Sequence, residues 1–340
     1  SSATVVNQSG LIETVGSGEP RIDFLGNTKG ALLLEPQRTN LISYSQAFDN
    51  AAWAKNNLTV TSNAAISPDG TLNADLLNFT SSGNYIDYAG TITVGQTYTV
   101  SCYVKSAVPS NQTFVIYGNA NKSSGTITAT SQWQRFTHTF TADITAMSSG
   151  INSTALNQLY VWGFQLEVGS YSTSIIPTSG QSGGVTRVTE DNTLPLQGYD
   201  LSGSFSLFFS FGKSLKTVQS SMIIFSIITS SNKLQLYTNA SGNDGINLYL
   251  QNQGGYVFNA NANDGWNVEQ SKICITYDST SNRLVYFING SIYGQQTSAL
   301  NFGTISSGGL NANNNVFETR EHKFYNTALT DAEAIALTTI

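Results

Sequence analysis

Short runs in which apolar and polar residues alternate are the feature that most constrains the fold of this chain. Residues 97–105 (TYTVSCYVK) alternate throughout, and residues 133–140 and 159–167 repeat the pattern. Successive side chains of a β-strand point to opposite faces, so a period of two predicts half-buried strands. Regular short strands separated by turn residues are typical of a β-sandwich or jelly roll.

The composition agrees with pleated strands. Charged residues make up 11% of the chain, and there are 30 Gly but only 6 Pro. Ser, Thr and Asn supply polar outer faces and tight turns where Lys and Glu would otherwise stand. We therefore expect an all-β protein with two antiparallel β-sandwich (jelly-roll) domains in tandem and one short C-terminal helix.

The 340 residues are enough for two domains. Residues 1–45 are expected to form an extended lead-in or fibre-connecting segment, and residues 46–178 a first jelly roll. The Gly- and Ser-rich residues 179–196 are the expected linker, and residues 197–340 the second sandwich. Within the last region, Asn289-Gly290 predicts a type I′ hairpin turn. Thr330 and Glu333 predict a capping box that opens the helix.

Charge and hydropathy exclude two classes of partner. The net charge is −6, and apart from Lys213 and Lys216 the basic residues do not cluster, so nucleic-acid binding is not expected. We find no apolar run long enough for membrane insertion and no signal peptide. The chain begins at Ser1, which we interpret as a sign of missing upstream parts. Cys102 and Cys274 each lie in an apolar strand and are expected to be buried, reduced thiols.

Catalytic motifs are not evident, so we expect no enzyme. The two histidines, His138 and His322, both alternate with aromatic residues and are interpreted as structural. Glycoside hydrolysis needs two apposed carboxylates. The nearest candidates, Glu318 and Glu321, lack the required spacing and should point to opposite faces of a strand. A pair assembled from loops or across subunits keeps a polysaccharide depolymerase open as an alternative.

Alternation also predicts which side chains face outward. In residues 159–167 we expect Tyr160, Trp162, Phe164 and Leu166 to face the core. If the three alternating strands share a sheet, its open face carries the candidate carbohydrate-binding residues Tyr103, Lys105, Arg135, Gln165 and Glu167. The second domain adds the candidates Tyr256, Trp266 and Tyr293. An aromatic side chain beside charged and amide groups suits a saccharide site. The alternative is that this face packs on another subunit or is merely solvated.

Two sets of motifs carry a resemblance to known families. In the first half, LLEPQRTNL (residues 33–41), YSQAF (44–48), WQRF (133–136) and WGFQLE (162–167) resemble a segment recurrent in phage structural proteins, in modules similar to carbohydrate-binding jelly rolls. In the second half, VYFING (285–290) and EHKFYNTAL (321–329) resemble laminin-G-like, concanavalin-A-like lectin sandwiches.

The resemblance implies a virion structural protein, a tail fibre, tailspike or head fibre, that forms a homotrimer. It implies a location on the virion surface after synthesis in the host cytoplasm. The expected partners are a bacterial surface glycan, for host attachment, and other virion proteins through the N-terminal segment. The first module's resemblance also implies a structural Ca²⁺, for which Asp49, Asp75 and Glu167 are candidate ligands. No other cofactor is expected. A structural capsid or fibre decoration without a specific ligand remains the alternative to an adhesin.

Overall fold

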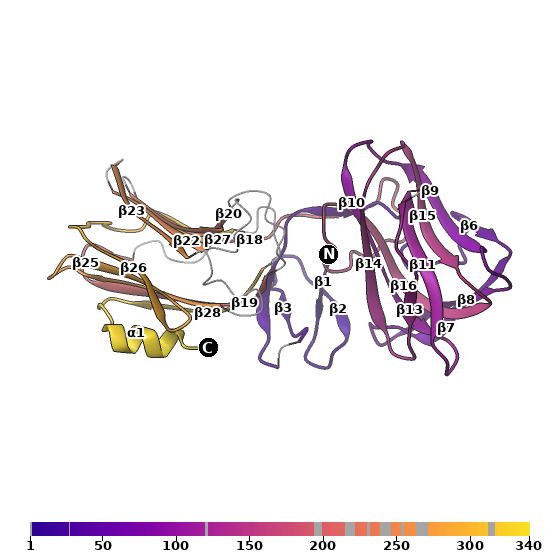
Figure 1. Ribbon diagram of the computed structural model, residues 1–340, viewed down its shortest axis with the longest axis horizontal. Coiled ribbons are helices and arrows are strands. Elements are labelled where there is room, and N and C mark those ends of the chain that lie inside the picture. Colours follow the sequence, from indigo (N-terminus) through magenta and orange to yellow (C-terminus); the bar gives the residue numbers. More distant parts are fainter. Residues whose placement is uncertain are drawn as a thin grey trace. The chain divides into compact units, whose positions relative to one another are not determined.

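The structure is a computed structural model that describes residues 2–26, 28–119, 122–193, 199–214, 222–229, 232–238, 246–252, 255–262, 271–311 and 317–340. The chain forms two compact units. Unit 1 comprises Ser1–Thr28 and Arg38–Val188, and unit 2 comprises Lys29–Gln37 and Thr189–Ile340. Antiparallel sheets make up both units (Figure 1), which confirms the expected all-β class.

Two sheets of unit 1 face each other as a sandwich. The five-stranded sheet has the order β14-β10-β16-β8-β7. Its strands are β7 (Leu58–Ile66), β8 (Leu72–Phe79), β10 (Thr97–Ser106), β14 (Gln134–Thr141) and β16 (Asn157–Val168). The six-stranded sheet has the order β12-β11-β15-β9-β6, with β13 also pairing β11. Its strands are β6 (Trp53–Asn56), β9 (Tyr85–Thr91), β11 (Gln112–Asn119), β12 (Lys122–Ser123), β13 (Ile127–Ala129) and β15 (Ala146–Ser153).

Smaller pairings complete unit 1. One hairpin joins β1 (Ala3–Val6) to β2 (Ile12–Val15), and β5 (Arg38–Asn40) pairs with β17 (Val185–Arg187). The short strand β3 (Ile22–Asp23) follows the hairpin.

The core of unit 1 lies between its two large sheets. The inward side chains of β10 are Tyr98, Val100, Cys102 and Val104, as alternation predicts. Trp53 packs into the same core and is 2% exposed. Its ring nitrogen donates a hydrogen bond to the carbonyl of Tyr44 (2.9 Å), so the buried indole N–H has a partner.

Unit 2 is a second sandwich. One sheet has the order β18-β27-β20-β21-β22-β23, and the other contains β26-β25-β24-β19-β28-β4. The strands are β4 (Ala31–Leu34), β18 (Asp191–Thr193), β19 (Phe205–Ser214), β20 (Met222–Ile228), β21 (Lys233–Thr238), β22 (Ile246–Asn252), β23 (Gly255–Ala262), β24 (Ser271–Asp278), β25 (Arg283–Ile288), β26 (Ser291–Thr297), β27 (Ser307–Asn311) and β28 (Phe317–Tyr325).

Phe205, Phe209 and Ile275 lie in the core between these sheets. The outer face of β19, β24 and β25 packs on helix α1 (Asp331–Thr338) through Phe208, Cys274 and Ala334. Because both faces of β19 are buried, its near-continuous apolar sequence is explained. Figure 1 shows α1 lying along this sheet.

Local turn and cap signals in unit 2 are confirmed. Asn289 (φ 46°) and Gly290 (φ 79°) both adopt positive φ between β25 and β26, as a type I′ turn requires. The Thr330 hydroxyl accepts from the Glu333 amide, and the Glu333 carboxylate accepts from the Thr330 amide. Cys102 and Cys274 are both free and buried, as predicted, and burial raises the pKa of each to about 12.

The units divide the chain differently from the expected boundaries. Residues 1–45 are not one lead-in, because Ser1–Thr28 belong to unit 1 and Lys29–Gln37 to unit 2. Strand β4 pairs with β28, and Leu34 lies in the unit 2 core. The expected linker 179–196 also contains strands β17 and β18. Among the described residues, no helix is long and apolar enough to span a membrane.

Candidate functional site

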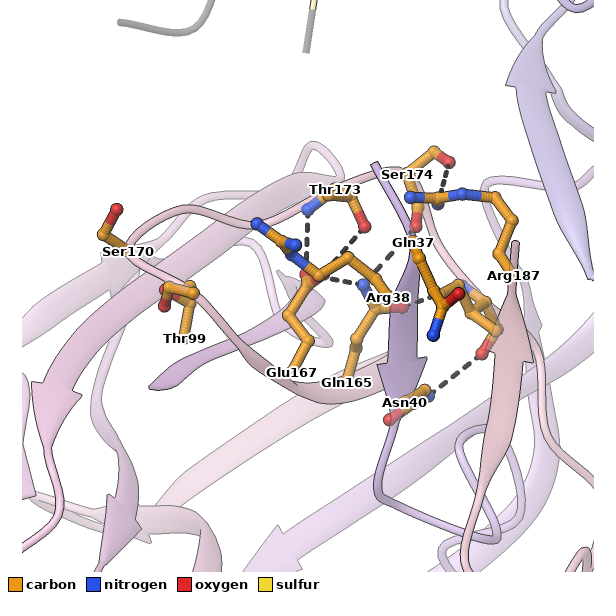
Figure 2. A network of polar contacts seen from close by, with 12 residues as sticks. Gln37, Arg38, Asn40, Thr99, Gln165, Glu167, Ser170, Thr173, Ser174 and Arg187 are labelled. Atoms are coloured by element: carbon orange, nitrogen blue, oxygen red, sulfur yellow. Dashed lines mark hydrogen bonds and ion pairs between the residues drawn. The ribbon is translucent and has the colours of Figure 1, made fainter. Parts of the chain in front are cut away.

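Gln165 and Glu167 do not lie on an open face. Both side chains are 0% exposed, because residues 170–176 cover them. Glu167 accepts hydrogen bonds from the Thr173 amide (2.8 Å), the Thr173 hydroxyl (2.7 Å) and the Gln165 side-chain amide (2.8 Å). Gln165 in turn accepts from the Ile176 amide (2.7 Å). The two side chains point away from the core as expected, but the expectation that their face is open is wrong, because they hold a covering segment in place (Figure 2).

The charge on Glu167 is balanced inside this network. An ion-pair contact joins its Oε2 to Nε of Arg38 at 3.7 Å. Burial raises the pKa of the Glu167 carboxyl, while its hydrogen bonds and the charge of Arg135 act in the opposite direction. Asn40 ties the same region together, since its amide donates to the carbonyls of Phe164 and Ile176. Buried polar groups satisfied in this way specify one arrangement of neighbouring segments.

A β-bulge in β16 changes which residues face outward. Ser101 of β10 pairs with Gln165, but Tyr103 pairs with Trp162, so β16 contains one extra residue there. Gly163 occupies the bulge with φ +65°, a conformation that glycine adopts without a Cβ penalty. The parity of the strand is therefore opposite on the two sides of Gly163.

This shift corrects the predicted core face of residues 159–167. Phe164 and Leu166 face the core as expected, but Leu159 and Val161 do so instead of Tyr160 and Trp162. Trp162 packs on the other face, with Ile12, Ala74 and Ile175, in a separate cluster. A glycine inside an alternating strand is itself a signal for a bulge, and Gly163 carried that signal.

The corrected parity brings five partly exposed side chains together on the outer face of the five-stranded sheet. We call them the outer patch: Tyr103, Lys105, Trp133, Arg135 and Tyr160. Strand register places Tyr103 beside Arg135 of β14. It places Lys105 beside Tyr160 of β16. The structure thus brings together three residues of the predicted site, Tyr103, Lys105 and Arg135. Alternation alone did not identify Tyr160 as a fourth neighbour.

Cations lie over aromatic rings throughout the outer patch. Nζ of Lys105 is 4.9 Å from the ring centroid of Trp133 and 5.3 Å from that of Tyr160. Cζ of Arg135 is 5.5 Å from the ring centroid of Tyr103. Such cation–π contacts hold long side chains in place while leaving their donors available. Burial lowers the pKa of Lys105.

The tip of the β7–β8 hairpin bends toward the outer patch. Nε1 of Trp133 donates to the carbonyl of Ile66 (3.0 Å), although Trp133 precedes β14 and Ile66 ends β7. These strands are the two edges of the five-stranded sheet, about 19 Å apart for flat strands at ordinary spacing. The contact therefore requires a curved sheet or a curled hairpin, and β7 has an irregular register between Thr61 and Ala65. The outer patch is bounded on one side by this hairpin tip.

The unit 2 candidates are placed only in part. Tyr293 lies on β26 and is 37% exposed, so its ring remains accessible. The side chain of Tyr256, on β23, and all of Trp266 lie outside the described residues. Elsewhere in unit 2, a depression of about 590 Å³ is lined by residues that include Arg283, Asp331 and Asn326. Arg283 and Asp331 form an ion pair with each other at 2.7 Å.

The candidate calcium ligands do not form one group. Both carboxylate oxygens of Asp75 accept backbone amides, from Phe48 (2.8 Å) and Asn63 (2.9 Å). Asp49 is exposed nearby, but Glu167 belongs to the separate network described above. Within the described part of the chain, no three His, Cys, Asp or Glu side chains are gathered for a metal ion. The residues do not fit the expected set, and calcium binding stays an untested expectation.

The residues considered for catalysis are placed in structural surroundings. Burial lowers the pKa of His322 to about 4, and its Nε2 shares a hydrogen bond with the Thr319 hydroxyl. The ring of His138 stacks on Phe140, with centroids 6.0 Å apart. Glu318 is buried, whereas Glu321 is exposed and pairs with Lys323 at 2.8 Å.

Comparison with known proteins gives only distant likenesses. No protein-family model matches the sequence, and no curated protein matches it. Among solved structures, the CBM40 of the Ruminococcus gnavus IT-sialidase is 15% identical, covers 43% of this chain and 96% of its own, and has a TM-score of 0.34. A SAP-like pentraxin from Limulus polyphemus is 15% identical over 43% of this chain and 74% of its own, with a TM-score of 0.33. These similarities assign no residue and no ligand to this chain.

Proposed function

We propose that this chain is a non-enzymatic carbohydrate-binding protein and that unit 1 binds glycan through the outer patch. The observation that carries the proposal is the partly exposed array of three aromatic rings and two cations on adjacent strands. Aromatic faces stack on the C–H faces of sugar rings, and Lys and Arg donate to hydroxyl or ring oxygens. A few convergent polar groups beside apolar surface are what fix the orientation of a small ligand.

The array is also pre-organised. Each cation is held over a ring, and Arg135 Nη2 donates to the Ser101 hydroxyl (2.9 Å). Trp133 is fixed by its hydrogen bond to Ile66. Side chains already ordered in the free protein lose little rotamer entropy when a ligand binds. This favours a binding surface over a merely solvated face.

At a finer level, we propose that the glycan belongs to a bacterial surface and that the chain is part of a virion fibre, a homotrimer that attaches a phage to its host. The support is the resemblance of residues 33–48, 133–136 and 162–167 to phage structural modules. Light scattering on the purified chain tests the trimer. A structural decoration without a ligand and a depolymerase are the competing roles.

Binding of the purified chain to intact bacteria and to their extracted surface polysaccharides, with released reducing sugar followed in the same tube, tests the proposal. Saturable binding without sugar release is expected. Tyr160→Ala should weaken it by about tenfold or more, which corresponds to about 1.4 kcal/mol. Tyr85→Ala, which removes an exposed tyrosine from the other sheet of unit 1, is the matched control and should bind normally.

Other outcomes would contradict this account. Release of reducing sugar would establish a depolymerase. Failure to bind any polysaccharide would favour a structural fibre or capsid role. If Tyr160→Ala and Tyr85→Ala weakened glycan binding equally, the outer patch would not be the binding site.

A further inference from the structure

The outer patch contains cations but no paired carboxylate. Lys105 makes no ion pair with any described residue, and burial alone shifts its pKa, so no nearby acid offsets its lost hydration. A partly buried ammonium between two rings is stabilised by an anion that approaches from solvent, because the described residues place none beside it.

Most hydrogen-bond donors of the Arg135 guanidinium also lack an acceptor among the described residues. Among the described residues, its side chain makes one hydrogen bond, to Ser101, and its buried Nε finds no acceptor. The charge of Arg135 acts to lower the pKa of Glu167. That carboxylate is buried, however, and already contacts Arg38, Gln165 and Thr173. Most donors of this guanidinium therefore remain for an external acceptor.

A third donor without a partner lies beneath the same face. Trp162 is 1% exposed, and its Nε1 has no hydrogen-bond partner in the part of the chain that the structure describes. Its ring contacts that of Tyr103 edge-on, with centroids 5.5 Å apart. Buried donors normally have a hydrogen-bond acceptor. An indole N–H without one, on the same sheet face as two cations without an ion-pair partner among the described residues, indicates a region with too few acceptors.

The charge of the patch contrasts with that of the chain, which has 21 acidic and 15 basic residues. Lys105 and Arg135 form no ion pair with a described residue, so an acidic protein that repels anions in general can attract them at this sheet face. Lys105 and Arg135 lie on neighbouring strands two residues apart in register, so their Cα atoms are about 8 Å apart at ordinary strand spacing.

Resting on the proposed function, we infer that the outer patch selects an anionic saccharide, one whose carboxylate or phosphate groups contact Lys105 and Arg135 while its rings stack on Tyr160 and Trp133. The cations supply the selectivity for charge, and the rings supply contacts that any pyranose can make. A neutral glycan would leave both cations without an anion.

The test uses the full chain and an array of purified acidic and neutral bacterial polysaccharides. The strongest acidic binder is then compared with its carboxyl-reduced or dephosphorylated form. We expect the strongest binder to be acidic, and removal of its charge to weaken binding by about tenfold or more. Binding should also weaken as salt is raised from about 50 to 500 mM, because exposed charges are screened. Carboxyl reduction and dephosphorylation distinguish the two sources of charge.

Charge-removing variants connect the preference to the patch. Lys105→Gln and Arg135→Gln should each weaken binding of the charged form far more than binding of the uncharged form, and so abolish most of the preference. Lys122→Gln, which removes a cation from the other sheet of unit 1, should leave the preference unchanged. Thermal unfolding of each variant separates lost binding from lost folding.

Two results would overturn the inference and are distinguishable. Equal binding of charged and uncharged forms, still sensitive to Tyr160→Ala, would reject the preference for anions but leave the proposed function standing. No binding to any member of the array would reject both.

Discussion

At the residue scale, Gly163 decides which side chains form the outer patch. Alternation correctly predicted that Tyr103, Lys105 and Arg135 face away from the core, because β10 and β14 pair in a regular register. It was wrong for Tyr160 and Trp162 because the bulge at Gly163 reverses parity within one strand. The alternation of a strand can be read from its own residues. The bulge in β16 is defined by its pairing with β10, which lies some sixty residues earlier in the sequence.

Replacing Gly163 by alanine should therefore damage the site as well as the fold. A Cβ there would lie 3.1 Å from Ile175 Cδ1 on a backbone with φ +65°. We expect a loss of about 1–2 kcal/mol in the free energy of unfolding, and weaker glycan binding. Gly125→Ala, at a site with open space, is the control for denaturant unfolding. Unchanged stability in Gly163→Ala would mean that the bulge is not required.

His322 predicts a pH dependence of stability. Burial lowers the pKa of His322 to about 4 in the folded protein, whereas a histidine in the unfolded chain has its ordinary pKa of 6.5. The unfolded state therefore binds more protons between these values, and stability falls as pH drops from about 6.5 to 4. The loss should be about 1–3 kcal/mol, allowing for partial solvent screening. In His322→Gln the slope over this window should flatten, as measured by urea unfolding at several pH values; an unchanged slope would assign it to other groups.

At the element scale, the segment 170–176 explains why part of the predicted site was misplaced. Sequence patterns indicated that Gln165 and Glu167 share a face with Tyr103, but nothing local showed that a later segment would cover that face. The hairpin at Asn289-Gly290 and the cap at Thr330 were predictable because their chemistry involves only neighbouring residues. Covering segments depend on tertiary contacts such as the one between Glu167 and Thr173.

Truncating Glu167 should loosen this cover. Glu167→Ala leaves the Thr173 amide, the Thr173 hydroxyl and the Gln165 amide buried without their acceptor. At about 1–3 kcal/mol for each unsatisfied donor, we expect a loss of roughly 3 kcal/mol or more in unit 1 stability. Glu167→Gln keeps one acceptor oxygen and should lose clearly less. Equal effects of the two substitutions in thermal unfolding would contradict the network.

At the scale of the whole molecule, the chain builds unit 2 from two separated pieces. Leu34 of β4 is 3% exposed in the unit 2 core, and β4 pairs antiparallel with β28. The amide of Gln37 donates to the hydroxyl of Thr189 (2.9 Å), so the two pieces meet where β4 ends. Composition suggested a boundary near residues 179–196, but it could not show that an earlier strand belongs beyond that boundary.

A fragment of residues 189–340 should therefore be incomplete. Losing β4 uncovers the part of the unit 2 core that Leu34 fills and leaves the edge of β28 unpaired, which should cost about 3 kcal/mol or more and promote aggregation. Residues 29–37 joined directly to residue 189 should restore cooperative unfolding, because Gln37 and Thr189 are adjacent. Equal stability of unit 2 with and without residues 29–37 in denaturant titration would show that β4 is dispensable.

The central claim is that the outer patch binds a sugar, and a crystal structure of the chain with a bound oligosaccharide from its strongest polysaccharide ligand tests it most directly. The account predicts a sugar ring stacked on Trp133 or Tyr160 with its anionic group within hydrogen-bond distance of Lys105 or Arg135. A saccharide bound elsewhere, for example beside Tyr293 of unit 2, or an outer patch covered by another copy of the chain, would contradict it.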